Sequence, residues 1–83
     1  MNTANTFSQL ANYLLAADSQ EAMTSKLEAL LTPSEIRSIA MRLEIAKQLQ
    51  AGTPQREIAK NLGVGIATVT RGSRELKAGK FKV

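Results

Sequence analysis

The strongest constraint on folding lies in residues 55–73, QREIAKNLGVGIATVTRGS. Apolar residues recur at helical spacing from Ile58 to Leu62, and Gly63 follows where a helix C-terminus favours a residue that tolerates positive φ. A second helix is expected to begin near Ile66. Two short helices joined by so tight a turn have the spacing of a helix-turn-helix unit.

The first turn of the second helix in such a unit is expected to meet DNA base edges. Small, apolar and hydroxyl side chains there suit contacts with thymine methyl groups, bases or phosphates, and the polar side chains of the first helix suit phosphates. The DNA-contacting candidates are Gln55, Arg56, Lys60, Ile66, Ala67, Thr68 and Thr70. For Thr68 and Thr70 the alternative is that they are ordinary solvated helix positions. For Ile66 the alternative is that its side chain packs into the turn.

Charge is unevenly distributed along the 83 residues, whose net charge is +4. Residues 52–83 contain seven basic and two acidic residues, a net charge of +5, whereas residues 1–51 contain four basic and five acidic residues, a net charge of −1. The basic half is the one with the helix-turn-helix pattern, which favours a polyanion such as double-stranded DNA as partner. A solubilising charged surface is the alternative.

Length and composition exclude several classes of function. A domain of this size buries only about 60% of its unfolded surface, so a lone monomer would be marginal, and without cysteine no disulfide adds stability. We therefore expect a homodimer. The absence of Cys and His argues against zinc, a thiol nucleophile and the usual general base, so we expect no metal, no required cofactor and no enzyme.

The sequence shows no targeting or membrane-spanning pattern. No apolar run approaches the roughly 20 residues that cross a bilayer, and the N-terminus lacks a basic flank followed by an apolar core. We expect a cytoplasmic protein without a signal peptide, associated with the bacterial nucleoid if its partner is DNA.

Hydrophobic periodicity predicts an all-α fold of about five helices. The first is expected over residues 6–17, and Ser19 can cap the second. The third has a clear start signal, with Thr32 as N-cap, Pro33 at the first helical position and Glu35 three residues after the cap.

The expected organisation is a single domain with four parts. They are a disordered arm (1–5), a helical dimerisation core (6–51), the helix-turn-helix (53–77) and a frayed basic tail (78–83). Gly52 is expected to end the third helix. Thr53 and Pro54 are expected to be the N-cap and the first residue of the next helix.

The third helix is apolar on two sides. One face carries Ile36, Ile39, Ala40 and Leu43, and the nearly opposite face carries Met41, Ile45 and Leu49. A helix that is apolar on both sides is usually buried on both sides. We expect the second face to meet another subunit; the alternative is that the first two helices wrap the third within one chain.

Gly72 lies inside the second helix of the motif, where glycine costs about 1 kcal/mol relative to alanine. Either a ligand or phosphate approaches the backbone there, or a neighbouring helix packs closely. Arginine stacks on aromatic rings and forks onto carboxylates, so Arg42 and Arg71 facing one another across a cleft could hold an aromatic amino acid. The alternative is that both contact solvent or phosphate.

The run GIATVTRGS closely resembles the Trp repressor family, and LTPSE, RLEIA, QREIA and a later LK occur in the family's order. The resemblance covers about residues 31–77. It implies an intertwined helical homodimer that binds operator DNA as a transcriptional repressor. L-tryptophan, wedged between the core and the DNA-contacting unit, would fix the spacing of the two recognition helices as corepressor.

The same resemblance implies ligand-binding residues. Arg42 and Arg71 match the arginines that sandwich the indole, Thr32 matches a threonine that holds the carboxylate, and Gly72 matches the glycine beside the second arginine. Leu31 matches a leucine that the partner subunit contributes to the pocket.

Other positions depart from the family pattern. Glu75 stands where a serine meets the ligand's amino group, and Ala29 stands where a second pocket leucine occurs. The segment before Gln55 is one residue shorter, and the sequence ends at Val83 before the family's final helix. A DNA-binding regulator that needs no ligand is therefore the alternative, and a purely structural or protein-binding helical module is a third hypothesis.

Overall fold

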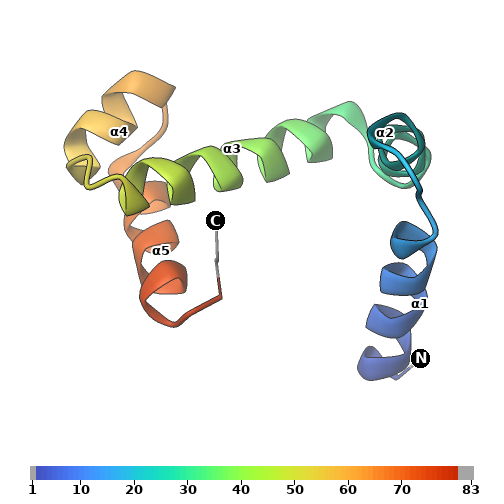
Figure 1. The fold of residues 1–83 in the computed structure, drawn as a ribbon. Coiled ribbons are helices and arrows are strands. Elements are labelled where there is room, and N and C mark those ends of the chain that lie inside the picture. The colour runs from blue at the N-terminus through green and yellow to red at the C-terminus, as the bar shows by residue number, and fades with distance from the viewer. Residues whose placement is uncertain (1, 81–83) are drawn as a thin grey trace. The chain divides into compact units, whose positions relative to one another are not determined.

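A computed structural model describes residues 2–80 of the chain. Its helices are α1 (Thr3–Leu15), α2 (Gln20–Leu30), α3 (Pro33–Gln50), α4 (Gln55–Leu62) and α5 (Ile66–Lys77), drawn in Figure 1. The described residues contain no strand, so the all-α fold is confirmed. Two compact units divide inside α3, Met1–Ile36 and Arg37–Val83, and each is described by itself. The division into a core over 6–51 and a helix-turn-helix over 53–77 stays a prediction.

The first helix begins earlier than its apolar pattern suggested. The Asn2 side chain accepts a hydrogen bond from the Ala4 N–H at 2.9 Å, and the Asn2 carbonyl accepts one from the Thr6 N–H at 2.9 Å. These bonds satisfy backbone donors of the first turn. The expected disordered arm over residues 1–5 is therefore wrong for residues 2–5, and residue 1 lies outside the described part.

The N-terminal unit has little core of its own, because no residue of α1 or α2 is fully buried. Ser19 caps α2 as expected, its hydroxyl accepting from the Ala22 N–H at 3.0 Å. The Lys26 ammonium lies 4.0 Å from the centroid of the Tyr13 ring, a cation–π contact between the two helices. Large apolar side chains of α1 stay exposed, among them Phe7 at 68%.

The start signal of α3 forms as predicted. The Thr32 N–H donates to Glu35 Oε1 at 2.8 Å, and the Glu35 N–H donates to the Thr32 hydroxyl at 3.2 Å. This reciprocal pair is a capping box. The Thr32 N–H, and secondly the Thr32 side chain, hold the pKa of Glu35 below its ordinary value, because a hydrogen bond donated to the carboxylate favours its charged form.

The core of the C-terminal unit joins three helices. Ile45 of α3, Ile58 of α4 and Val69 of α5 are almost wholly buried against one another, and Met41 and Leu49 pack around them. The face of α3 that was expected to meet another subunit is therefore covered by the chain's own helix-turn-helix. The expectation was wrong because periodicity shows that a face is apolar and does not show what covers it.

Helix α5 runs close to the C-terminal part of α3 (Figure 1). Gly72 of α5 lies against Ile45 and Leu49 of α3. A Cβ at this position would lie 2.8 Å from Ile45 Cγ2 and 3.7 Å from Leu49 Cδ1. The closer distance is shorter than real carbon contacts allow, so close helix packing explains this glycine. Of the two alternatives left open by the sequence, the structure supports the neighbouring helix.

Two boundaries differ from expectation. Pro54, rather than Thr53, is the N-cap of α4, and Gln55 is its first helical residue. Beyond α5, the Gly79 and Lys80 N–H groups donate to the carbonyls of Leu76 and Glu75, both at 3.0 Å. Residues 78–80 therefore form a hydrogen-bonded turn around Gly79, at φ +78°, instead of a frayed tail. Residues 81–83 of the expected tail lie outside the described part.

Replacing Gly72 with alanine is expected to lower the free energy of unfolding by up to about 2 kcal/mol. Alanine gains about 1 kcal/mol in helix propensity, but its Cβ would overlap the γ-methyl of buried Ile45, and overpacking costs about 1–3 kcal/mol. Urea denaturation of the wild type and of Gly72→Ala measures the difference. In the Ile45→Ala background the cost should disappear, and a stabilising Gly72→Ala in the wild-type background would contradict the close contact.

The carboxyl of Glu35 is expected to titrate below an ordinary glutamate. A lowered folded-state pKa means that the cap's stabilisation is present above the ordinary pKa and is lost as the pH falls through the lowered one. NMR titration of the Glu35 carboxyl carbon measures this. Thr32→Ala should reverse the shift only in part, because the backbone donor remains; an ordinary pKa in the wild type would show that the capping box does not form in solution.

Candidate nucleic-acid interface

The helix-turn-helix is built around a buried contact between its two helices. Ile58 of α4 and Val69 of α5 are both 0% exposed. Gly63 ends α4 in the left-handed region at φ +67°, and the Val64 N–H donates to the Ala59 carbonyl at 3.1 Å across the turn. Val64 also packs against the buried cluster, so the turn between the two helices contributes an apolar side chain to the core.

The first turn of α5 faces solvent. Ile66 is 49% exposed, and Ala67 and Thr68 are exposed beside it. The alternative in which Ile66 packs into the turn is therefore not the arrangement observed. A half-exposed isoleucine next to a small alanine makes a low apolar surface that matches the thymine methyl in the major groove.

Helix α4 of the same motif has two exposed basic side chains. Arg56 and Lys60 are exposed and four residues apart, which places them on one face of the helix. Their charges are available to phosphates, which supply most of the affinity of proteins for DNA.

Both helices of the motif begin without a side-chain cap. Pro54 precedes α4 and Gly65 precedes α5, and neither contributes a side-chain hydrogen bond. By contrast, Asn2, Ser19 and Thr32 cap the earlier helices. First-turn N–H groups without caps, with the positive end of the helix dipole, are suited to phosphate oxygens.

Gln55 and Thr70, both expected to contact DNA, are joined to each other by a hydrogen bond within the chain. The Thr70 Oγ1 lies 2.9 Å from Gln55 Oε1 and 3.0 Å from the Ile66 carbonyl oxygen. Sequence reasoning missed this bond, because it joins positions 15 residues apart in two helices whose relative placement depends on the core.

The residues that the resemblance implied for a ligand fall in both units. Within the C-terminal unit Arg42 and Arg71 are exposed, and Gly72 is packed against Ile45. Glu75 is only partly exposed and forms an ion pair with Lys80, Nζ to Oε2 3.2 Å. Lys80 was not among the expected residues, and its role depends on the turn around Gly79, which has no sequence signal beyond the glycine itself.

The other two implied residues belong to the N-terminal unit. Leu31 is half-buried at the C-cap of α2. The Thr32 hydroxyl accepts from the Glu35 N–H at the start of α3, and the Thr32 side chain also contributes to the lowered pKa of the Glu35 carboxyl.

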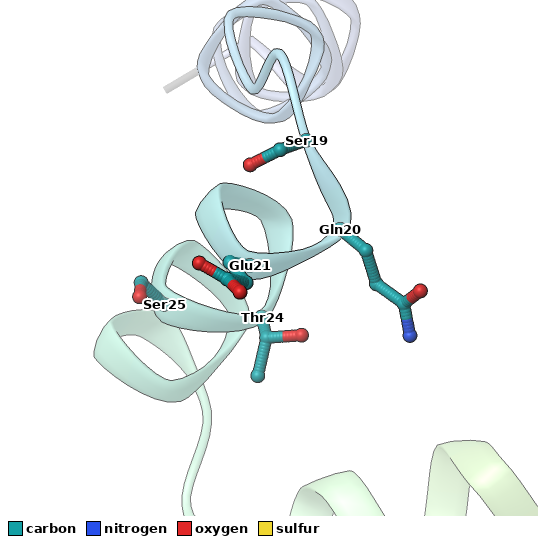
Figure 2. A pocket seen from close by; sticks show the side chains of 5 residues that line it. All are labelled: Ser19, Gln20, Glu21, Thr24 and Ser25. Atoms are coloured by element: carbon teal, nitrogen blue, oxygen red, sulfur yellow. The ribbon is translucent and has the colours of Figure 1, made fainter.

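A shallow recess lies at the start of α2 (Figure 2). The residues that line it all have polar side chains: Ser19, Gln20, Glu21, Thr24 and Ser25. None of the candidate DNA-binding or ligand-binding residues lines it, so it does not contribute to the interface.

Residues 2–80 contain neither a metal-binding cluster nor a membrane-spanning helix. No group of three or more His, Cys, Asp or Glu side chains there has an arrangement that could hold a metal ion. No helix in the same range is long and apolar enough to span a bilayer.

The chain as a whole has clear relatives. Residues 5–82 match the family model described as Trp repressor protein. The chain belongs to the Trp repressor family. It is therefore a DNA-binding regulator of transcription of the Trp repressor type, and not an enzyme.

Individual relatives agree with this assignment. A protein named Trp operon repressor homolog from Aliivibrio salmonicida is 41% identical over 73 residues, covering 87% of this chain and 68% of the relative. The protein of the same name from Vibrio cholerae is 42% identical over 71 residues, covering 84% and 69%. The one from Vibrio campbellii is 51% identical over 53 residues, covering 63% and 53%. No solved structure matches the chain.

Proposed function

We propose that the chain is a sequence-specific repressor that binds operator DNA as a homodimer, with L-tryptophan as corepressor. The observation that carries the DNA-binding part is the exposed first turn of α5, with Ile66 at 49%, held on the wholly buried contact between Ile58 and Val69. A rigid core beneath a low apolar surface is what a recognition helix needs to enter the major groove.

Each exposed group has a role in this proposal. Ile66 and Ala67 contact thymine methyl groups, and the Thr68 hydroxyl contacts a base or a phosphate. Arg56 and Lys60 hold phosphates and fix the register on the duplex. The uncapped N-termini of α4 and α5 add backbone donors to the same phosphates.

Exposed apolar side chains support the homodimer. On α3 Ile39 is 48% exposed and Leu43 is 41% exposed, on a face different from the one that packs against α4 and α5. On α1 Phe7 and Leu15 are 68% and 78% exposed. Burying such side chains against a second copy would supply the stability that a small monomer lacks, and it would place two recognition helices on half-sites about 34 Å apart.

Tryptophan binding is proposed for the surface near Arg42, Arg71, Gly72 and Glu75. The support is the family resemblance, together with exposed guanidinium groups that are free to stack on an indole. Leu31 and Thr32 are proposed to complete the ligand contacts. The cytoplasm, with the nucleoid, is the proposed location because operator DNA lies there.

A ligand-independent DNA-binding regulator is the second candidate function, and two observations favour it. Gly72 has a sufficient structural reason in its contact with Ile45. The Glu75 carboxylate is already paired with Lys80 at 3.2 Å, so a ligand ammonium group would have to replace that partner.

Substitutions of phosphate-contacting residues are expected to weaken binding to every duplex, whereas substitutions of base-contacting residues are expected to weaken binding to the preferred sequence alone. Lys60→Ala should weaken binding to all duplexes and lower the slope of log affinity against log salt by about 1. Ile66→Ala should weaken the binding free energy for a duplex that this protein has selected from a random pool by about 1–2 kcal/mol, because apolar contact is lost. Its affinity for random DNA should stay unchanged. Fluorescence anisotropy at several salt concentrations measures both.

Lys47→Ala is the matched control for the charge change, because Lys47 is an exposed lysine of α3 outside the proposed interface. Absence of DNA binding by the wild type at low salt would overturn the DNA proposal and favour a structural or protein-binding module. Binding that is equal on selected and random duplexes would remove sequence specificity.

L-tryptophan is expected to bind the dimer and to raise operator affinity. Arg71→Ala should abolish the heat of binding, whereas Lys80→Ala should tighten binding up to about fivefold by freeing the Glu75 carboxylate, since an exposed ion pair contributes at most about 1 kcal/mol. Isothermal calorimetry and operator titrations with and without L-tryptophan measure this. No heat together with unchanged operator affinity would leave the ligand-independent regulator.

A further inference from the structure

The Gln55–Thr70 hydrogen bond is a directional tie between the two helices of the motif. Gln55 is the first residue of α4 and Thr70 is the fifth of α5, and both are half-buried. Within residues 2–80 the other side-chain to side-chain hydrogen bond, from Gln48 to Glu44, stays inside one turn of α3. The Gln55–Thr70 bond is thus the one of this kind among the described residues that joins α4 to α5.

The Thr70 hydroxyl has two hydrogen-bond partners within the chain, the Gln55 side-chain amide and the Ile66 carbonyl. A threonine hydroxyl has one proton and two acceptor sites, and two oxygens lie within 3.0 Å of Thr70 Oγ1. If the Gln55 amide is turned so that its nitrogen faces Thr70, the amide donates to the hydroxyl, and the hydroxyl donates to the Ile66 carbonyl. In either orientation the two side chains are paired within the chain before DNA arrives.

The location of the bond gives it control over the direction of α5. Val69 fixes α5 to α4 through an apolar contact, which depends little on angle. Thr70 is 100° further around the helix, so a second tie there restrains rotation of α5 about its own axis. Ile66 lies one turn before Thr70 on nearly the same face, and a restrained Thr70 therefore fixes the direction in which Ile66 projects.

We propose that Gln55 is a positioning residue, which acts through Thr70 to orient the base-contacting turn of α5, rather than a direct contact to phosphate. Thr70 likewise orients Ile66 and Ala67 and does not itself contact a base. The inference rests on the proposed DNA-binding function. A direct contact would require each side chain to leave a formed hydrogen bond in a partly buried place, which offsets much of what the new contact contributes.

A double-mutant cycle tests the proposal. Gln55→Ala, Thr70→Ala and the double variant are titrated with the duplex selected by the wild-type protein and with the random pool itself. Each single variant should lower affinity for the selected duplex about tenfold, the double variant should lose no more than either single, and affinity for the random pool should stay unchanged.

Three further measurements separate positioning from folding and from direct contact. Thermal melting of every variant shows that the fold persists, with Gln50→Ala and Thr24→Ala as matched controls at exposed helix positions. Thr70→Ser keeps the hydroxyl and should restore specificity. In the free wild-type protein, the Gln55 side-chain NH₂ resonances should shift on Thr70→Ala and remain in place on Thr70→Ser.

The outcomes are distinct. Losses that add in the double variant, or that are equal on selected and random DNA, would overturn the positioning role and leave sequence-specific binding intact. Failure of Thr70→Ser to restore specificity in a folded variant would also overturn it. If the wild-type protein selects no duplex, the proposed function fails, and the positioning role fails with it.

Discussion

The contact between Gly72 and Ile45 determines how the helix-turn-helix is attached to the rest of its unit. A side chain at residue 72 would hold α5 away from α3, whereas glycine lets the backbone of α5 approach the Ile45 γ-methyl. Ile45 then lies in one cluster with Ile58 and Val69, so a single position links three helices. The cost of a glycine inside a helix is offset by the close packing that its missing Cβ allows.

That attachment divides α5 into parts with different roles. Val69 and Ser73 are buried and hold the helix, and Thr70 between them is tied to Gln55. One turn earlier Ile66 is left half-exposed on the same helix. The buried positions and the exposed first turn belong to the same 12-residue helix. A change in how α5 packs therefore also changes the direction in which its first turn projects.

Local signals in the sequence predicted most of the secondary structure. The capping box of Thr32 and Glu35 and the left-handed glycines at 52 and 63 depend on residues a few positions apart, and all of them formed. The covered face of α3, the tie between Gln55 and Thr70 and the pairing of Glu75 with Lys80 were not predicted. These depend on distant packing or on the turn around Gly79, so a reading of adjacent residues cannot supply them.

The buried cluster shared by the helices of the C-terminal unit limits how a small molecule could regulate it. A ligand shifts a conformational equilibrium only when its affinity differs between the two states. Arg42, Arg71 and Glu75 lie in a unit whose helices are fixed together by the Ile45 cluster, so contacts with these residues alone would be the same in both states. If L-tryptophan is the corepressor, it must also make contacts outside this unit, and the family resemblance implies Leu31 and Thr32 for that part.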